Sequence, residues 1–312
     1  MTLAEPIVYS YWTVSASQHP RAAVGVIGLG NMGTAIAERL LEAGYALRVH
    51  NRSRGKAASL AGQGAIVAES AGELAASVEI VLTSLSDDGA FEAVATDVAA
   101  AASPGAVLVD LSTVSPAASA RVAALAEEAS MLYLRAPVSG NPSVVRAGNL
   151  SFIVSGPDDA FEPAEPVLLA IGPTIHRVGD AEEARIVKLA INLVIAGLAQ
   201  LMAESLVLAE GSGVSRAALL ETMGDSAAGA PFVKYKTEPL LRDDYSATFT
   251  TTLMEKDVDL VLEAAESAGV RLPLALDIKR LLRSAIEAGH GDDDFMAVFP
   301  NLQSSAGREV MR

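Results

Sequence analysis

The 312-residue chain contains no cysteine, which excludes disulfide bonds, thiolate nucleophiles and cysteine-ligated metals together. This absence is typical of a protein in a reducing compartment, so we expect a cytoplasmic location. Aromatic residues make up only 4% of the chain. Basic residues are also scarce, because 23 lysines and arginines face 38 acidic residues and give a formal net charge of -15. Such an acidic protein is a poor match for nucleic acids or anionic membranes, so we expect neither as a partner.

Signals for secretion, metal binding and serine hydrolysis are missing as well. The first twenty residues have no basic start followed by an apolar core, as a secretory signal would. No GxSxG motif marks a serine nucleophile. The four histidines are far apart and show no ligand spacing: His19, His50, His176 and His290. We therefore expect no metal site.

The sequence does contain a glycine-rich turn in a suitable context. An apolar strand over Val24–Ile27 runs into GLGNMG and then into a helix, so the GxGxxG pattern lies between strand and helix. Gly28 permits the tight turn, Gly30 lets a pyrophosphate approach the backbone, and Gly33 allows close helix–strand packing. Free amides at the helix start would hold the phosphates. We predict a dinucleotide site that also includes the intervening residues Leu29, Asn31 and Met32.

The segment after the second strand, HNRSRGKA, indicates which dinucleotide is bound. A site selective for NAD(H) places an acidic residue about 20 residues after the glycines, where it binds the ribose hydroxyls. This chain has Asn51, Arg52 and Ser53 there. An acid would repel a 2′-phosphate, whereas an arginine and a hydroxyl bind it. The sequence therefore predicts that NADP(H) is preferred over NAD(H), with a solvated basic loop as the alternative.

Strand-like and helical segments alternate through the first half of the chain. Glu79–Leu85 and Ala106–Ser112 are strand-like runs, and each is followed by a helical segment. The alternation predicts an α/β fold with a Rossmann-type, doubly wound parallel sheet over residues 22–180. Ligands of such sheets bind at the carboxyl ends of the strands. The turns at these ends can supply hydroxyls and amides near a nicotinamide, and the candidates are Ser84, Leu85 and Thr113. Taken alone, each turn is more often ordinary turn chemistry.

The longest apolar stretch spans Asp180–Gly213. Asp180 and Glu183 match a capping box, which predicts the start of a helix, and glycines suit its end. The helix is apolar on nearly every side, so we expect it to be buried. Only fifteen residues separate Lys188 from Glu204, and a membrane span needs roughly 20. The rest of the chain reads as helices with short breaks, which predicts an all-α domain over residues 181–312. Residues 1–21 form an N-terminal extension.

Lys188 and Asn192 interrupt this apolar helix. They are four residues apart and so share a face. A buried ammonium is costly unless it is paired or neutralised. A lysine that snorkels to water, or a structural ion pair, would explain Lys188 as well as a catalytic role does. The helix alone does not choose between these readings.

The order of the motifs resembles the β-hydroxyacid dehydrogenase family, which includes relatives of 3-hydroxyisobutyrate dehydrogenase and of glyoxylate and succinic semialdehyde reductases. GLGNMG is followed by VDLSTVSP, APVSG and the lysine–asparagine pair. The resemblance covers Val24 to the C-terminus. It implies a Rossmann domain joined by the long helix to an all-α domain, and a homodimer whose helical domains often interlock.

The resemblance also implies roles for individual residues. Lys188 matches the family's catalytic lysine, and Asn192 matches the asparagine that orients the substrate or the lysine. The APVSG block matches the loop that grips the substrate carboxylate. Residues implied to bind substrate are Ser139, Gly140, Asn141 and Thr113. In MEKDVDL, Lys256 matches a lysine near the cofactor, and Asp257 matches a residue that supports the site.

Three departures from the family pattern concern the substrate more than the chemistry. The chain has Asn141 and Pro142 where the family usually continues with a second glycine, which stiffens the carboxylate-binding loop. Arg135 precedes APVSG in place of the common aspartate. Ile191 replaces the first of two asparagines that often follow the lysine. The resemblance therefore implies the reaction type more firmly than a particular substrate.

The predicted reaction is hydride transfer between a nicotinamide and a small carboxylate-bearing aldehyde, ketone or 3-hydroxyacid. Lys188 would act as general acid and base, because burial lowers a lysine pKa from its usual value of about 10.4. One alternative is an imine reductase or reductive aminase, although those enzymes generally carry aspartate or tyrosine at this position. Another is a non-catalytic NADP-binding interaction module.

Overall fold

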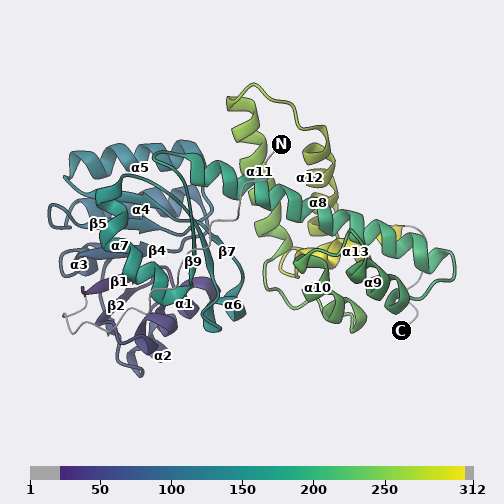
Figure 1. The fold of residues 1–312 in the computed structure, drawn as a ribbon, viewed down its shortest axis with the longest axis horizontal. Coiled ribbons are helices and arrows are strands. Elements are labelled where there is room, and N and C mark those ends of the chain that lie inside the picture. Colours follow the sequence, from purple (N-terminus) through teal and green to yellow (C-terminus); the bar gives the residue numbers. More distant parts are fainter. Residues whose placement is uncertain (1–21, 306–312) are drawn as a thin grey trace, which may run out of the picture.

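The computed structural model describes residues 22–305, so the N-terminal extension over residues 1–21 lies outside the described residues. Figure 1 shows two lobes side by side, with the long helix α8 (Glu183–Gly211) running from one into the other. The first lobe is built on a sheet, and the second is helical. The junction between the lobes therefore lies along the first turns of α8.

The first lobe holds a nine-stranded sheet in the order β3-β2-β1-β4-β5-β6-β8-β7, and β9 also pairs with β8. Its strands are β1 (Val24–Ile27), β2 (Leu47–His50), β3 (Ile66–Val67), β4 (Ile80–Thr83), β5 (Val107–Asp110), β6 (Leu132–Arg135), β7 (Val138–Ser139), β8 (Ser151–Ser155) and β9 (Thr174–Gly179). Its helices are α1 (Asn31–Glu42), α2 (Ala58–Ala61), α3 (Ala71–Ala75), α4 (Asp88–Ala99), α5 (Pro116–Glu128), α6 (Pro142–Arg146) and α7 (Asp158–Ile171), with a 3₁₀ turn at Arg54–Ala57.

The central strands are buried on both faces because helices cover both sides of the sheet. Successive side chains of a strand point to opposite faces. Ile80 and Leu82 belong to a core with residues of α1 and α7, whereas Val81 belongs to a second core with residues of α3, α4 and α5. This arrangement confirms the Rossmann-type, doubly wound fold.

The sheet is mixed rather than wholly parallel, which corrects the sequence prediction. The pairs from β3 to β6 are parallel, but β8 pairs antiparallel with β6 and β7. The chain leaves β6, continues through β7 and the short helix α6, and returns on β8. An apolar run marks a buried strand in the sequence, but it carries no information on the direction in which the strand runs.

Helix α8 ends as expected but begins differently. It runs to Gly211, and Gly213 just beyond has a φ of +81°, as a glycine after a helix often does. The helix begins at Glu183, and its N-cap residue is Glu182 without a side-chain capping bond. The predicted cap at Asp180 is therefore wrong. The Glu183 carboxylate instead accepts from the amide of Ala181 at 2.7 Å.

Helix α8 is also less buried than its composition suggests. Four of its large apolar side chains are 47 to 71% exposed: Ile186, Val194, Leu201 and Leu208. By length and composition the helix is apolar enough to cross a membrane, with 39% of its most apolar window buried. The helical core of a protein outside a membrane passes the same test. Here the buried face of α8 packs against α11, α12 and α13.

The second lobe surrounds the second half of α8 with short helices. They are α9 (Arg216–Asp225), α10 (Pro231–Leu241), α11 (Thr251–Ser267), α12 (Pro273–Ala285) and α13 (Val298–Ser305), with single turns at Ile286–His290 and Phe295–Ala297. Their shared core includes Ala203 and Leu206 of α8 and Phe295. The all-α domain that follows the sheet is confirmed. Helix α10 carries Pro239 close to its C-terminal end.

Candidate active site

The glycine turn between β1 and α1 has the shape that a pyrophosphate requires. Gly28 has a φ of +93°, and a Cβ atom there would lie 2.2 Å from the Ser84 carbonyl oxygen. A Cβ atom on Gly33 would lie 1.8 Å from the Gly28 carbonyl oxygen. At Gly30, by contrast, a Cβ atom would meet nothing within 4 Å. Gly28 and Gly33 are therefore required by packing, whereas Gly30 leaves open space for a ligand.

Asn51 holds the glycine turn from the end of β2. Its Oδ1 accepts from the Leu29 amide at 2.8 Å, and its Nδ2 donates to the Ser53 carbonyl at 3.1 Å. Arg52 and Ser53 are exposed beside it. Asn51 thus stands where an NAD-selective site would place an acidic residue.

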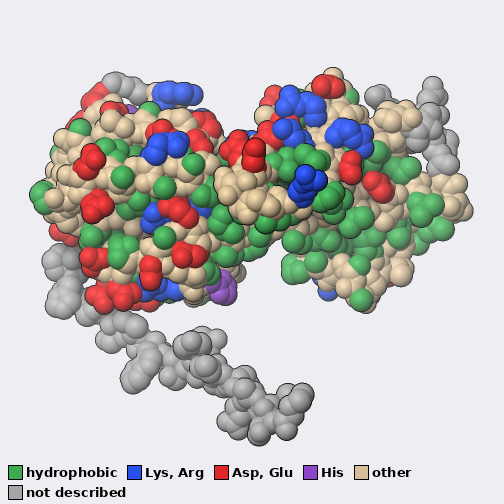
Figure 2. Space-filling view, turned by 90° about the horizontal axis from the view of Figure 1, so that it is seen from above, with side chains coloured by type: hydrophobic (Ala, Val, Ile, Leu, Met, Phe, Trp, Pro, Cys, Tyr) green, Lys and Arg blue, Asp and Glu red, His purple; other side chains and the backbone are tan. Residues whose placement is uncertain are grey.

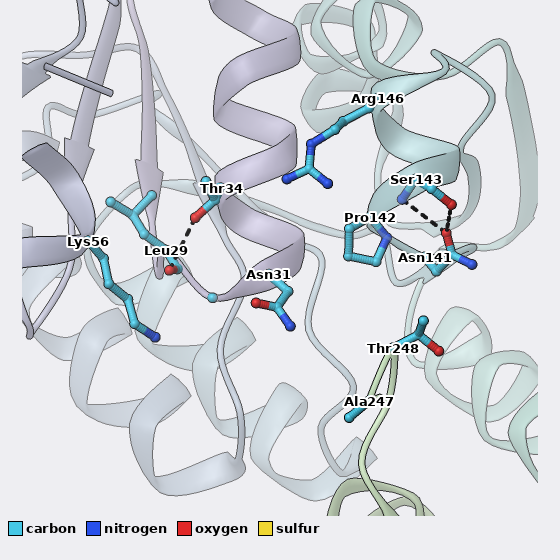
Figure 3. Close-up of a pocket in the computed structure, with 11 residues that line it drawn as sticks. Leu29, Asn31, Thr34, Lys56, Asn141, Pro142, Ser143, Arg146, Ala247 and Thr248 are labelled. Carbon is cyan, nitrogen blue, oxygen red and sulfur yellow. Dashed lines mark hydrogen bonds between the residues drawn. The ribbon is translucent and has the colours of Figure 1, made fainter. Parts of the chain in front are cut away.

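A cleft of about 540 Å³ opens beside this turn (Figure 3). Its wall comes from the glycine turn, from the head of α6 and from the segment before α11. The lining residues are Leu29, Gly30, Asn31, Thr34, Lys56, Asn141, Pro142, Ser143, Arg146, Ala247 and Thr248. Both cations, Lys56 and Arg146, reach the cleft from opposite sides, although Arg146 also pairs with Glu38 at 3.0 Å. An open glycine turn with nearby cations fits a dinucleotide phosphate group.

The APVSG segment ends in a tight turn next to the cleft. Ser139 pairs with Ser151 in the antiparallel β7–β8 ladder, and Gly140 follows with a φ of +143°. Asn141 then caps α6, because its Oδ1 accepts from the amides of Ser143 and Val144 at 3.0 and 3.1 Å. Among the hydrogen bonds found within residues 22–305, none joins Ser139 or Gly140 to Lys188. The Asn141 side chain thus offers a ligand only its Nδ2 group.

Lys188 lies at the junction of the two lobes, and neighbouring side chains organise its surroundings. Asn192 donates from Nδ2 to Asp257 Oδ2 at 2.5 Å, and Asp257 is fully buried. Lys188 itself makes no hydrogen bond or ion pair with any residue between 22 and 305. Its amine is therefore available to a ligand, although the structure assigns it no direct contact with Asn192.

Burial lowers the pKa of Lys188, Asp257 raises it, and Lys256 lowers it further, with a net shift below the ordinary lysine value of 10.5. The side chain is partly rather than fully exposed, so desolvation is effective. A lysine that exchanges its proton more readily than usual is suited to acid–base catalysis. Within residues 22–305 no ion pair holds Lys188, so a structural ion pair does not describe it, whereas its partial exposure also fits a lysine that snorkels to water.

Lys256 connects the two lobes across the junction. Its Nζ donates to the Thr113 carbonyl oxygen at 2.7 Å and lies 2.9 Å from Asp257 Oδ1. Thr113 follows β5, so it lies at the carboxyl edge of the sheet, where Ser84 and Leu85 follow β4. The structure thus brings Thr113, Lys256 and Asp257 together. Met32, in the first turn of α1, is only partly buried.

Two features of the junction were missed in the sequence. Thr248, which lines the cleft, donates to Asp294 at 2.9 Å, and Asp294 forms a buried ion pair with Lys236 at 2.7 Å. Arg185 is buried one turn before Lys188. The same reasoning that singled out Lys188, a charge inside an apolar helix, also applies to Arg185 and would have found it.

Comparison with known proteins agrees with this geometry. A profile described as the NAD binding domain of 6-phosphogluconate dehydrogenase matches residues 23–179. A second, described as NAD-binding of NADP-dependent 3-hydroxyisobutyrate dehydrogenase, matches residues 183–302. The 2-(hydroxymethyl)glutarate dehydrogenase of Eubacterium barkeri is 32% identical over 92% of this chain and 97% of its own length.

Two solved structures extend the comparison. Mycobacterium tuberculosis 3-hydroxyisobutyrate dehydrogenase with L-serine is 32% identical, with a TM-score of 0.82 over 90% of this chain and 99% of that one. An imine reductase from Pseudomonas sp. is 26% identical, with a TM-score of 0.60 over 90% and 99%.

Fold, site and comparisons together define an NAD(P)-dependent oxidoreductase that acts on CH–OH groups. The chain belongs to the β-hydroxyacid dehydrogenase family. Membership in a family of enzymes favours catalysis over a non-catalytic binding module.

Proposed function

We propose that this protein catalyses NADP(H)-dependent hydride transfer between the nicotinamide and a small carboxylate-bearing aldehyde, ketone or 3-hydroxyacid. The observation that carries the proposal is the amine of Lys188. It is partly buried, its pKa is lowered, and it makes no hydrogen bond or ion pair within residues 22–305. It lies at a junction that Thr113 and Lys256 tie to the sheet edge where nucleotides bind.

When bound, NADP(H) supplies or accepts the hydride. In reduction, the protonated Lys188 amine donates a proton to the carbonyl oxygen of the substrate. In oxidation, the neutral amine accepts the hydroxyl proton. Asn192 is fixed by Asp257, so its side-chain oxygen can orient the substrate or the amine. Burial lowers the pKa of Lys188, Asp257 raises it and Lys256 lowers it, and the net lowering favours release of the proton.

The preference for NADP(H) rests on the residues that follow β2. Asn51 occupies the place of the acidic residue and is committed to the glycine turn. Arg52 and Ser53 are exposed beside it and are free to approach a 2′-phosphate. An arginine and a hydroxyl form charge-assisted hydrogen bonds to phosphate.

The proposed substrate class is based on one turn near the cleft and on the names of related enzymes. Ser139, Gly140 and Asn141 form a turn that is stiffened by the Asn141 cap of α6, and we assign this turn to the substrate carboxylate. The names of the relatives, 2-(hydroxymethyl)glutarate dehydrogenase and 3-hydroxyisobutyrate dehydrogenase, describe substrates that carry both a carboxylate and a hydroxyl. The stiff turn, with Pro142 after Asn141, favours an enzyme that accepts substrates of one fixed shape over an enzyme with a broad substrate range.

We also propose that the enzyme is a homodimer formed along α8. The exposed apolar residues Ile186, Val194, Leu201 and Leu208 recur every seven or eight positions and so lie on one face. Figure 2 shows hydrophobic side chains gathered over the helical lobe, on the right of the view. Apolar patches of this kind mark association surfaces. In a two-fold dimer both subunits use the same surface, so the exposed apolar stripe of α8 would pack against the same stripe of the second copy.

The test is NADPH consumption by the full-length enzyme across short aldehyde and keto acids, including glyoxylate and succinic semialdehyde. Each assay is repeated with a primary amine and with a cyclic imine. We expect turnover of the carboxylate-bearing carbonyl compounds without amine. Turnover only of imines, or only when amine is present, would instead identify an imine reductase or reductive aminase. Equal turnover with NADH would contradict the cofactor preference.

A further inference from the structure

Arg185 is a buried charge at the junction that has no part in the proposed chemistry. Its side chain is 1% exposed, and it lies three residues before Lys188 on the same helix. Nη2 forms an ion pair with Asp110 Oδ2 at 2.6 Å, and Asp110 is fully buried. The guanidinium also donates to the Tyr133 hydroxyl at 2.8 Å, the Ser112 carbonyl at 2.8 Å and the Ser119 hydroxyl at 3.2 Å.

The partners of Arg185 all belong to the sheet lobe. Asp110 ends β5, Tyr133 lies in β6, and Ser119 lies in α5. Burial raises the pKa of Tyr133, so its hydroxyl stays neutral and accepts from the guanidinium. A planar guanidinium with five donors in a fixed geometry can satisfy several acceptors at once, which a flexible lysine cannot. Arg185 therefore fixes the first turn of α8 in position and orientation against the strand ends.

Asp110 also hydrogen-bonds residues at the edge of the sheet where we expect the nicotinamide to bind. Its Oδ1 accepts from the hydroxyls of Thr83 and Ser112, each at 2.6 Å. The Ser112 hydroxyl in turn accepts from the Leu85 amide at 2.9 Å. A continuous chain of hydrogen bonds thus runs from Arg185 to the backbone that follows β4. The position of Leu85 depends on the same carboxylate that holds α8.

Two cations from different helices hold neighbouring carbonyls of one turn. Arg185 binds the Ser112 carbonyl from α8, and Lys256 binds the Thr113 carbonyl from α11 at 2.7 Å. Lys256 also pairs with Asp257, which accepts from Asn192 on α8. These contacts form a closed loop: they join α8 to the turn after β5, that turn to α11, and α11 back to α8. Lys188 lies between the two points at which α8 is held.

A purely stabilising role explains this arrangement poorly. Removing two charges from water offsets most of the attraction between them, so a buried ion pair by itself is weak support for a fold. Positioning requires several directed contacts with rigid elements, and Arg185 has them. We propose that Arg185 is a positioning residue, which sets the distance between the Lys188 amine and the nicotinamide edge of the sheet. The kinetic part of this inference rests on the proposed hydride transfer.

The test compares Arg185→Met and Arg185→Lys with Arg135→Met. Arg135 is a control of similar burial: it is 6% exposed, binds Glu182 beside the start of α8 and lies over the Tyr133 ring, but it does not contact the turn at Ser112. We expect Arg185→Met to lower kcat for succinic semialdehyde about 10- to 100-fold, because a displacement of a catalytic group by about 1 Å can cost about 100-fold in rate. KM should change little, and the isotope effect with deuterated NADPH should rise. Arg185→Lys should recover part of kcat, whereas Arg135→Met should leave it within about threefold.

A second readout does not depend on activity. Hydrogen–deuterium exchange is followed by mass spectrometry in peptides that cover residues 108–116 and 184–192. In Arg185→Met, we expect exchange to rise in both segments together, whereas Arg135→Met should affect only the start of α8. If Arg185→Met does not fold, the double variant Arg185→Met with Asp110→Asn removes both charges and should show the same coupled rise.

The outcomes separate the two proposals. A wild-type enzyme that turns over no substrate overturns the proposed function, and the exchange experiment then decides the role of Arg185 alone. If residues 108–116 exchange as in the wild type in the Arg185 variants, the coupling does not exist. A drop in melting temperature equal to that of Arg135→Met, with unchanged kcat, would show that Arg185 only stabilises the fold.

Discussion

Replacing Lys188 with methionine tests the central assignment, because methionine keeps the length of the side chain and removes its charge. General acid–base catalysis contributes typically 10²- to 10⁴-fold to a rate. We therefore expect kcat to fall by about 10²- to 10⁴-fold. NADPH affinity should be unchanged, since Lys188 is not among the residues that line the cleft beside the glycine turn. Lys234→Met, on an exposed position of α10, is the control and should leave kcat as in the wild type.

The same substitution should stabilise the protein at neutral pH. The pKa of Lys188 is lowered by burial in the folded state, so the folded protein releases this proton more readily than the unfolded chain. Below the folded-state pKa the amine is charged in both states, and its burial costs free energy in full. The cost decreases as pH rises through the folded-state pKa, and it disappears above the unfolded value near 10.5. Lys188→Met should thus gain about 1 kcal/mol at pH 7, or about 2–4 °C in Tm.

The wild-type pH profile follows from the same shift. Reduction requires the charged amine, so its rate should fall as pH rises through the Lys188 pKa, whereas oxidation should increase over the same range. Both inflections should lie below 10.5, because the pKa is lowered. Stopped-flow measurement of NADPH consumption and differential scanning calorimetry of the variants provide the data. A Lys188→Met enzyme that retains kcat within about threefold, or that is less stable at pH 7, would refute the reasoning.

Three further substitutions test the rest of the site. Arg52→Asp should change the ratio of the NADPH and NADH Kd values by about 10- to 100-fold in favour of NADH, since a charge-assisted hydrogen bond contributes about 1.5–3 kcal/mol. Fluorescence titration with both nucleotides measures the two Kd values. Gly30→Ala should fold normally but lose nucleotide affinity, because its Cβ atom would occupy the open space that the pyrophosphate needs, whereas Gly33→Ala should unfold the lobe. Calorimetry measures the folding of both variants and titration measures their nucleotide affinity. Tight NADPH binding by Gly30→Ala would contradict the proposed site. Leu201→Glu should convert the proposed dimer to a monomer in light scattering. Leu274→Glu on α12, where the leucine is 64% exposed against 59% for Leu201, should not.

Local sequence was enough to predict those parts of the site that are formed by residues close together in the chain. Gly28, Gly30 and Gly33 could be assigned separate tasks because a strand–turn–helix unit is formed by consecutive residues. The geometry agrees at each of them, with open space at Gly30 and contacts at Gly28 and Gly33. Lys188 and Asn192 were singled out because helix periodicity places residues four apart on one face. The alternation of apolar runs likewise predicted the Rossmann lobe.

Tertiary structure decided what depends on residues that are distant in the chain. Arg185 and Asp110 are separated by 75 residues, and no local pattern shows that they pair. The direction of β8 was not predictable because an apolar run reads the same in both directions. The exposed stripe of α8 was hidden for a related reason: composition shows that a helix is apolar, but only the packing of its neighbours decides which face remains uncovered. The sequence thus specifies the chemical groups, and long-range packing sets the distances at which they act.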